Sequence, residues 1–270
     1  MRSAGLIDTH AHLQSEKFAS DLPALIENAR AAGVDDIVIC AGSRGDWGRC
    51  AELARQYDLS YMLGIHPLAT PDVAPDETAH LEAAVSQAMA DPHFIGIGEV
   101  GIDLLVPLDN EKQERIFAEE LRIARRYALP LSVHVRKSAS RLLKYLRRTP
   151  PSGGVIHAFN GSDAERDAFL SLGFKLGFGG AATYAGSLRI RRHLAAVPPD
   201  AWVIETDSPD MPSSARRDAG SLRTEPSDLA ETLLLAAHLR GISPQEAARE
   251  SRSNALSAFP RLKCRLPCAS

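Results

Sequence analysis

The first apolar run of the chain ends in a histidine pair, His10 and His12. Alternate residues of a β-strand point to the same side, so a strand ending here directs both imidazoles to one face. Two converging imidazoles suit a borderline divalent cation such as Zn²⁺, Mn²⁺ or Ni²⁺. Two neighbouring histidines are often incidental, and the pair alone is weak support for a metal site.

The same placement recurs at the ends of four more apolar runs, which finish in Glu99, His134, His157 and Asp207. Histidines that only fill a core would also fall in the middle of strands, on helix faces and in loops. The repeated placement therefore favours a metal site over an incidental set. Four histidines and two acids exceed what one tetrahedral ion needs. They match two ions roughly 3.5–4 Å apart that share a carboxylate.

The hydrophobic pattern indicates which elements carry these side chains. Eight short apolar runs are typical of strands, and they span Leu6–Thr9, Asp36–Ala41, Ser60–Gly64, Phe94–Gly98, Pro130–His134, Gly154–Phe159, Lys175–Phe178 and Ala201–Glu205. Stretches with helical periodicity alternate with them, among them residues 22–32, 110–127, 164–172 and 188–196, and two more follow at 226–239 and 244–257.

This alternation predicts an α/β fold of the (β/α)8 TIM barrel type. A doubly wound open sheet shows the same alternation and stays open as the alternative on periodicity alone. The 270 residues permit one barrel, which typically needs about 250. We expect a single barrel domain over residues 1–260 and a loose C-terminal tail at 261–270. Residues 213–222, rich in Ser, Arg, Ala and Gly, predict a long mobile loop.

A closed barrel arranges the strand ends in a ring and so decides which ligands are neighbours. His10, His12 and Asp207 would hold one ion, because strands eight and one lie side by side. His134 and His157 would hold the other ion. Glu99 is the natural bridge, since its strand lies between those of the two groups. An open sheet need not bring Asp207 beside His10, so this closure tests the barrel.

Charge and composition exclude few partners. The net charge of −3 is not the broad positive surface of a protein that wraps nucleic acid. A nucleic-acid substrate still fits if bound metal and a few local Arg or Lys side chains supply the positive field. The N-terminus has no charged-then-apolar leader, and no apolar run approaches the ~20 residues of a spanning helix. We expect a cytoplasmic monomer with no membrane partner.

Five motifs in this order give the chain a resemblance to the TatD family of metal-dependent deoxyribonucleases, in the amidohydrolase-like barrel superfamily. The motifs are IDTHAHL from residue 7, GEVGID from residue 98, VHVR from residue 133, VIHAF from residue 155 and ETDSP from residue 205. The resemblance runs from Leu6 to about Phe259. The sequence DSPDMP at residues 207–212 resembles a branch of the family close to the bacterial YjjV proteins.

The resemblance implies a set of roles for individual residues. The metal ligands would be the six residues found at the strand ends: His10, His12, Glu99, His134, His157 and Asp207. His66 and Arg136 would contact a substrate phosphate. Asp103 would steady a loop or a ligand imidazole, and Thr206 would do the same.

The reaction implied is phosphodiester hydrolysis, with 3′–5′ exonuclease-like trimming of DNA and two divalent ions (Zn, Mn, Mg or Ni). The catalytic residues would be Asp207, which takes a proton from a metal-activated water, and the bridging Glu99. DNA or another phosphate ester would bind only transiently. The alternative is a metal-dependent ester or amide hydrolase, including a deacylase on a small or aminoacylated substrate. A metal-binding scaffold without activity is a third interpretation.

The chain departs from the family pattern around the mouth of the barrel. Val135 and Asn160 stand where hydroxyl residues are common, and Asp210 stands where nucleases of the family commonly have Tyr. Residues 104–107, Leu-Leu-Val-Pro, replace a segment that is often aromatic. Fewer aromatic side chains leave fewer platforms for stacking bases. These departures bear on the substrate, because none of them touches a predicted metal ligand.

Overall fold

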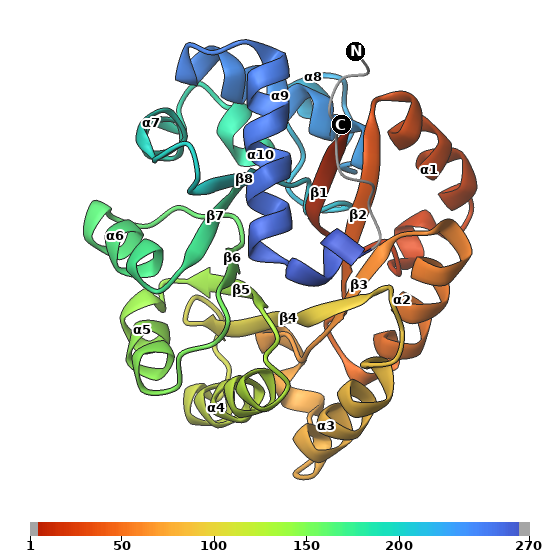
Figure 1. Ribbon diagram of the computed structural model, residues 1–270, viewed down its shortest axis with the longest axis vertical. Helices are drawn as coiled ribbons and strands as arrows, with labels where there is room; N and C mark the ends of the chain where they lie inside the picture. The colour runs from red at the N-terminus through yellow and green to blue at the C-terminus, as the bar shows by residue number, and fades with distance from the viewer. Residues whose placement is uncertain (1–4, 265–270) are drawn as a thin grey trace.

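The computed structural model of the protein describes residues 5–264 and contains one eight-stranded parallel sheet in sequential order, β1 to β8. The strands are β1 (Leu6–Ala11), β2 (Val34–Cys40), β3 (Ser60–Leu63), β4 (Phe94–Asp103), β5 (Leu131–Arg136), β6 (Gly154–Ile156), β7 (Phe174–Phe178) and β8 (Trp202–Ile204). Helices surround the sheet (Figure 1). The (β/α)8 prediction is confirmed.

The α-helices are α1 (Leu22–Ala31), α2 (Arg44–Tyr57), α3 (Glu77–Ala88), α4 (Asn110–Arg126), α5 (Ala139–Arg148), α6 (Asp163–Ser171), α7 (Leu188–Ala196), α8 (Ser214–Asp218), α9 (Leu229–Arg240) and α10 (Pro244–Ala258). Shorter 3₁₀ turns are η1 (Glu16–Phe18), η2 (Pro67–Asp72), η3 (Gly180–Thr183), η4 (Pro226–Asp228) and η5 (Pro260–Cys264). Among all these helices and turns, both α4 and η2 contact strand β4.

Helix α4 shows how sequence defines such an element. It begins after Asp109, whose side chain accepts a hydrogen bond from the backbone N–H of Lys112. It ends in Arg125 and Arg126, whose positive charges suit a helix C-terminus. One face is apolar and buries Phe117 against the sheet side of the helix.

The barrel closes between β8 and β1 through the residues just after β8. The backbone N–H of Asp207 donates to the carbonyl of His10 (2.9 Å), and that of His12 donates to the carbonyl of Ser208 (2.7 Å). The buried carboxylate of Asp8 accepts from both the N–H and the hydroxyl of Thr206 (2.9 and 2.6 Å). This seam places Asp207 beside the His10 strand, as a closed barrel requires.

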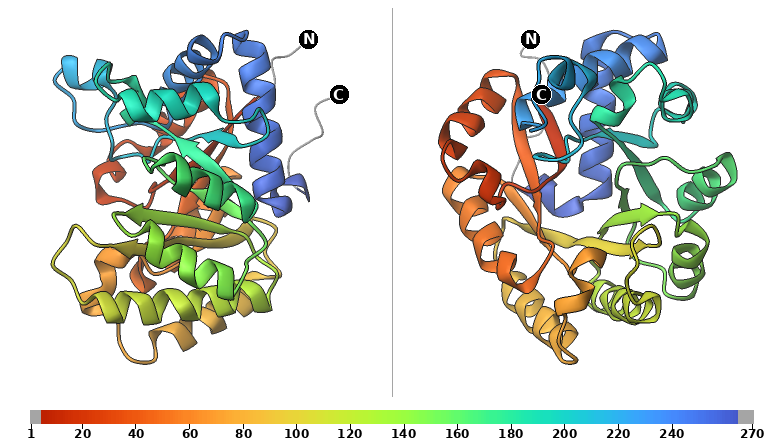
Figure 2. Two further views of the ribbon diagram at one scale, coloured as in Figure 1. Left: turned by 90° about the vertical axis from the view of Figure 1, so that its left-hand side faces the viewer. Right: turned by 180° about the vertical axis from the view of Figure 1, so that it is seen from behind.

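The inside of the barrel is packed and has a plug at the end opposite the mouth. Ile7, Val38 and Ile95 are among the buried interior side chains, and Phe259 and Leu262 pack against them from the C-terminal part of the chain. Figure 1 shows α10 lying across this end, and the right panel of Figure 2 shows the barrel from behind. The mouth, where the strands end, is therefore the accessible end of the barrel.

Several elements differ from the sequence-based expectation; β6, for example, ends at Ile156 instead of Phe159, so His157 follows the strand. Strand β4 continues to Asp103, beyond the predicted end at Gly98, because residues 100–103 pair with β5 in register. Glu99 thus lies within a strand. The predicted mobile loop at 213–222 contains helix α8, which begins where the Ser213 side chain accepts from Arg216 N. The Arg216 guanidinium also donates to both carboxylate oxygens of Asp228, so this segment is tied to η4.

The expected tail at 261–270 falls partly within the structure. Leu262 is buried, and the guanidinium of Arg261 donates to the carbonyl of Asp91 (3.0 Å). Residues 265–270 lie outside the described residues. No helix within residues 5–264 is both long enough and apolar enough to cross a membrane.

Candidate metal centre

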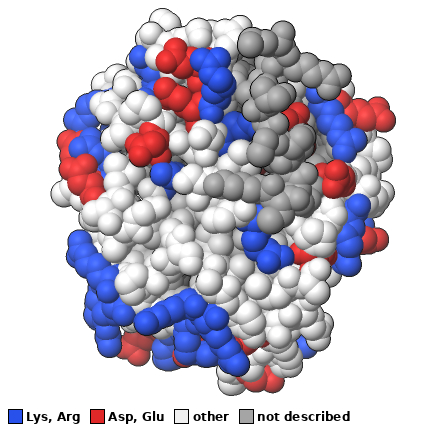
Figure 3. Space-filling view, in the orientation of Figure 1, with Lys and Arg blue, Asp and Glu red and all other residues white. Residues whose placement is uncertain are grey.

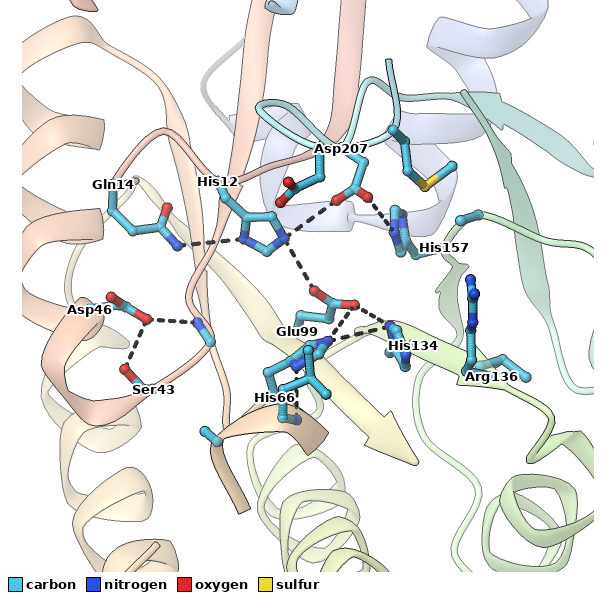
Figure 4. Close-up of a pocket in the computed structure, with 17 residues that line it drawn as sticks. His12, Gln14, Ser43, Asp46, His66, Glu99, His134, Arg136, His157 and Asp207 are labelled. Carbon is cyan, nitrogen blue, oxygen red and sulfur yellow. Dashed lines mark hydrogen bonds and ion pairs between the residues drawn. The ribbon is translucent and has the colours of Figure 1, made fainter. Parts of the chain in front are cut away.

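A cavity of about 520 Å³ opens at the mouth of the barrel. Its walls carry five of the six predicted ligands and both predicted phosphate contacts: His12, Glu99, His134, His157, Asp207, His66 and Arg136. The sixth ligand, His10, is fully buried just below, with its ring against His157 (centroids 3.8 Å apart). Figure 4 shows His12, Glu99 and Asp207 facing one another, with His134 and His157 beside them. The structure therefore brings all the predicted site residues together.

Glu99 lies at the centre of this group, with its two oxygens facing different histidines. Oε2 is 3.2 Å from His10 Nε2 and 3.3 Å from His12 Nε2. Oε1 is 2.9 Å from His134 Nδ1 and 3.4 Å from His66 Nε2. A carboxylate in this position can contribute one oxygen to each of two ions, which is the geometry that a bridging ligand needs.

Asp207 joins the opposite side of the cluster. Its Oδ1 is 3.4 Å from His12 Nε2 and 3.8 Å from His10 Nε2, while Oδ2 is 3.5 Å from His157 Nε2. His157 thus lies with His10 and Asp207, whereas His134 lies with His66 and Glu99. This differs from the expected pairing of His134 with His157. The reason is that the buried rings of His10 and His157 stack, which the strand order alone does not reveal.

Four histidines are oriented so that one ring nitrogen remains free to bind a cation. His12 Nδ1 lies 2.9 Å from the carbonyl of Cys40, which can only accept, so Nδ1 donates there and Nε2 faces Glu99 and Asp207, where a bound cation would replace its proton. His134 is held in the same way through Nε2, 3.3 Å from Asp103. His157 is held through Nδ1, 2.9 Å from Glu205. Such partners fix the tautomer of a metal-binding imidazole.

The ring of His10 is held by a side-chain hydroxyl in place of a carbonyl or carboxylate. Its Nδ1 lies 2.8 Å from Ser132 Oγ, and Nε2 faces the cluster. A hydroxyl can accept from Nδ1–H, which leaves Nε2 available. The free nitrogens of all four histidines, together with two carboxylates, form the mixed nitrogen and oxygen donor set that suits zinc, manganese or nickel. The residues present therefore fit a pair of divalent ions.

His66 has the opposite tautomer. Its Nδ1 accepts a hydrogen bond from the backbone N–H of Leu68 (3.0 Å), so in the neutral ring the proton is on Nε2. That N–H points at Glu99 Oε1 and at His134 Nδ1. A protonated ring nitrogen cannot bind a metal ion, but it can donate to an anionic oxygen. His66 thus directs a donor N–H into the cluster, and its expected role as a phosphate contact stays a prediction.

Burial and neighbouring charges shift the pKa values of the clustered side chains. Burial works against ionisation of Glu99, but the neighbouring His66 and His10 outweigh it and hold the pKa of the carboxyl well below its usual range. Burial also opposes the charged form of His12, yet hydrogen bonds to Asp207 and Glu99 raise its pKa to about 10. Burial and the adjacent His157 lower the pKa of His10. The cluster thus keeps its carboxylates ionised and attracts positive charge.

Three partners of the ligands were not found from the sequence: Ser132, Glu205 and the carbonyl of Cys40. Ser132 and Glu205 each stand two residues before a ligand, His134 and Asp207, and a strand period of two places such residues on the same side. That spacing was the available signal. No sequence signal marks a backbone carbonyl.

Of the residues expected to steady the site, Asp103 contacts a ligand imidazole, 3.3 Å from His134. Thr206 instead bonds to Asp8 at the barrel seam. Arg136 is exposed at the edge of the cavity beside His134, and Figure 4 draws no interaction to it. Its guanidinium is thus available to an anionic ligand.

Comparison with known proteins agrees with this geometry. The family described as TatD related DNase matches residues 7–260. The metal-dependent hydrolase YjjV of Escherichia coli (strain K12) is 31% identical over 94% of this chain and 97% of its own length. The crystal structure of YjjV superimposes with a TM-score of 0.89, 30% identity and coverage of 94% of this chain and 98% of that one. The 3′-5′ ssDNA/RNA exonuclease TatD of the same strain is 29% identical over 94% of this chain and 98% of its length.

The barrel, the six-residue cluster at its mouth and these matches define a metal-dependent hydrolase. The chain belongs to the TatD family. Its similarity to YjjV agrees with the branch that the sequence at 207–212 resembles.

Proposed function

We propose that this protein binds two divalent cations and hydrolyses phosphodiester bonds at the 3′ end of single-stranded nucleic acid. The observation that carries the proposal is the position of Glu99, with one oxygen toward His10 and His12 and the other toward His134. Bound divalent ions supply Lewis acidity, which makes water a nucleophile near neutral pH and stabilises negative charge on phosphate oxygens. The sharing of one carboxylate supports two ions rather than one.

The ligands divide between the two ions by proximity. His10, His12, His157 and Asp207 would surround one ion, and His134 would hold the other, with Glu99 between them. The mixed imidazole and carboxylate donors are compatible with Zn²⁺, Mn²⁺ or Ni²⁺, and with Mg²⁺ at the more oxygen-rich side.

The remaining residues act on the proton and on the substrate. Asp207 lies 3.4 Å from His12 and 3.8 Å from His10, which would hold one ion, and its ionised carboxylate would accept a proton from the attacking water. His66 Nε2–H and the Arg136 guanidinium donate to non-bridging or leaving oxygens of the phosphate. All of these groups line one cavity, so no covalent nucleophile is needed.

The choice of nucleic acid follows from the relatives. Escherichia coli TatD is described as a 3′-5′ ssDNA/RNA exonuclease, and the match spans nearly the full length of both chains. The cavity is open, and bound metal ions with Arg136 and the His66 N–H would offset its carboxylates and receive the anionic end of a strand. We further propose that the enzyme acts as a monomer, since one chain supplies all six proposed ligands, and that it works in the cytoplasm. Size-exclusion chromatography with light scattering tests the monomer.

The test compares two substrate classes on metal-loaded protein. We expect 5′-labelled single-stranded DNA to be shortened stepwise from the 3′ end with Mn²⁺ or Mg²⁺, and not with EDTA. A carboxylic ester and an aminoacylated nucleotide serve as alternative substrates. If the ester or the aminoacyl bond is hydrolysed while the DNA stays intact, the deacylase alternative replaces the nuclease proposal.

A pair of variants ties the activity to this site. Asp207→Asn removes the proposed proton acceptor, whereas Asp210→Asn removes an exposed acid of the same cavity that pairs with Lys17 (2.9 Å). We expect the first variant to lose at least 10²-fold in kcat, the scale of general-base contributions. The second should keep wild-type activity. Equal activity of both variants would exclude Asp207 from the reaction.

A further inference from the structure

A second cavity of about 450 Å³ lies outside the catalytic pocket, between the segment that follows η2 and the first turns of α4. Apolar side chains of Val73, Pro75 and Ile116 line part of it. Lys112 and Arg115 of α4 line the rest. Apolar walls beside two cations form a surface that could take a ligand with a flat apolar part and an anionic part.

The two cations are available to such a ligand. Lys112 and Arg115 are three residues apart in α4, and residues at this spacing lie on the same side of a helix. Among residues 5–264, no carboxylate forms an ion pair with either of them. The acid that lines the cavity, Glu119, lies 2.8 Å from the Nε of Arg122, which compensates its charge. The cavity therefore carries a net positive lining.

The chain connects this cavity directly to the catalytic pocket. His66 precedes η2, Leu68 and Ala69 line the catalytic pocket, and Val73 at the other end of η2 lines the second cavity. Six residues of 3₁₀ helix at about 2 Å each span roughly 12 Å. The surface between the two cavities is mixed: Leu68 is 52% exposed, and Arg44 and Asp72 line a hollow that Ala69 and Val73 share with the two cavities. A single strand of nucleic acid is long enough to reach across this distance.

We propose that the second cavity is a nucleotide subsite for the single-stranded substrate, a few nucleotides away from the bond that is cleaved. A base would lie against Pro75 and Ile116, where its apolar faces leave water. Its phosphate would bind Lys112 and Arg115. The subsite compensates for the scarcity of aromatic platforms at the mouth, because it holds the strand at a distance from the reaction. This inference rests on the proposed nuclease function.

The test is a charge reversal of the two cations, Lys112→Glu with Arg115→Glu. The probe is a 5′-fluorescein-labelled single-stranded DNA of about twelve nucleotides, and its binding is measured by fluorescence anisotropy in EDTA over a range of salt concentrations. We expect the affinity at low salt to fall about tenfold or more. The slope of log K against log salt should become shallower by about 1.4, since each phosphate contact to a single strand contributes about 0.7.

A matched control makes the same change of charge in α5, whose residues do not line the second cavity. Arg147 and Arg148 lie in the last turn of α5, and Figure 3 shows basic side chains gathered where Figure 1 places the ends of α4 and α5. The double variant Arg147→Glu with Arg148→Glu should bind the DNA as the wild type does. Equal weakening by both double variants, or no weakening by the first, would overturn the subsite.

Hydrolysis of a small substrate measures the reaction at the catalytic pocket without binding at the proposed subsite. Bis(p-nitrophenyl) phosphate has a phosphodiester bond and no further nucleotides. Its hydrolysis with Mn²⁺ should have unchanged kcat and KM in the Lys112→Glu, Arg115→Glu protein, while KM for the DNA rises about tenfold. If the wild type hydrolyses neither substrate, the nuclease proposal fails. The binding data then still decide whether Lys112 and Arg115 hold single-stranded DNA.

Discussion

Within the site, the hydrogen bond made by one nitrogen of each imidazole decides what the other nitrogen can do. His12 donates through Nδ1 to the carbonyl of Cys40 and turns Nε2 toward the cluster, whereas His66 accepts from Leu68 at Nδ1 and presents an N–H at Nε2. The sequence offers these residues as equivalent histidines near strand ends. The structure divides them into those that can bind a cation and one that can donate to a substrate.

This division gives a prediction for His66 and His157. His66→Ala should lower kcat/KM for a phosphodiester by about 10²–10³-fold, the usual effect of removing one donor to developing negative charge. Its metal content should equal that of the wild type. His157→Ala should lose bound metal as well as activity. The measurement is steady-state kinetics beside metal analysis by mass spectrometry, and loss of a metal equivalent from His66→Ala would contradict its assignment as a donor.

At the scale of elements, the site depends on how closely β4 approaches its neighbours. Gly101 has φ +149°, and a Cβ there would lie 2.1 Å from the carbonyl oxygen of His134. Gly64 is similarly close, because a Cβ would lie 2.6 Å from the carbonyl of Glu99. Glycine at these points lets β3, β4 and β5 bring Glu99 and His134 together.

Gly101→Ala should therefore destabilise the protein and displace His134. We expect a loss of at least about 1–3 kcal/mol, the scale for a residue forced into a rare backbone conformation, and weaker metal binding. Gly48→Ala in α2 is the matched control, since nothing lies within 4 Å of the added Cβ. That change should stabilise by up to about 1 kcal/mol through helix propensity. Urea denaturation of both variants measures the difference; equal stabilities would refute the close approach.

A second feature at this scale is Glu120 of α4, which is fully buried and accepts a hydrogen bond from the backbone N–H of Ile65 (2.8 Å). Its other oxygen, Oε2, has no hydrogen-bond partner among the described residues. Burial raises the pKa of this carboxyl well above its usual value, and the bond from Ile65 only partly opposes it. Glu120 thus holds the segment before His66 while it stays protonated.

Glu120→Gln should make the stability of the protein less dependent on pH. Because the folded pKa is raised, the folded state holds a proton that the unfolded state has released, so stability is lost as pH rises from the unfolded toward the folded pKa. Glutamine keeps the acceptor for Ile65 without a titrating proton. We expect a higher Tm than wild type at pH 8 and little difference at pH 4, with each 1 kcal/mol worth about 2–4 °C. An equal shift at both pH values would show that Glu120 does not titrate in this way.

At the scale of the whole molecule, the ligands come from β1, β4 and β5 and from the residues just after β6 and β8, so metal binding requires the closed barrel. The seam that closes it is made by Asp207, Ser208 and Thr206 with β1. A metal site that is built only in the folded chain stabilises that chain when it is occupied.

Divalent cations should therefore raise the Tm of EDTA-treated protein. At a free concentration of 100 times Kd, one site contributes about 2.7 kcal/mol, which corresponds to roughly 5–10 °C. Differential scanning fluorimetry with Mn²⁺ or Zn²⁺ measures the rise. The Asp210→Asn variant should show the same rise in Tm as the wild type, and the Asp207→Asn variant should lose most of that rise. A full rise in Tm for Asp207→Asn would remove Asp207 from the ligand set.

The sequence by itself predicted the barrel, six candidate ligands and the edge where they meet, because strand period and βα alternation are local properties that depend on residue type. Strand order placed Glu99 between two groups, and the resemblance to the TatD family implied the position of Asp103 beside a candidate ligand. Only the tertiary structure decided that His157 stacks on His10, that His66 has the donor tautomer, and that α4 and residues 73–75 form a second cavity. These features depend on which side chains and carbonyls from distant segments come into contact, and that is set by packing rather than by any local pattern.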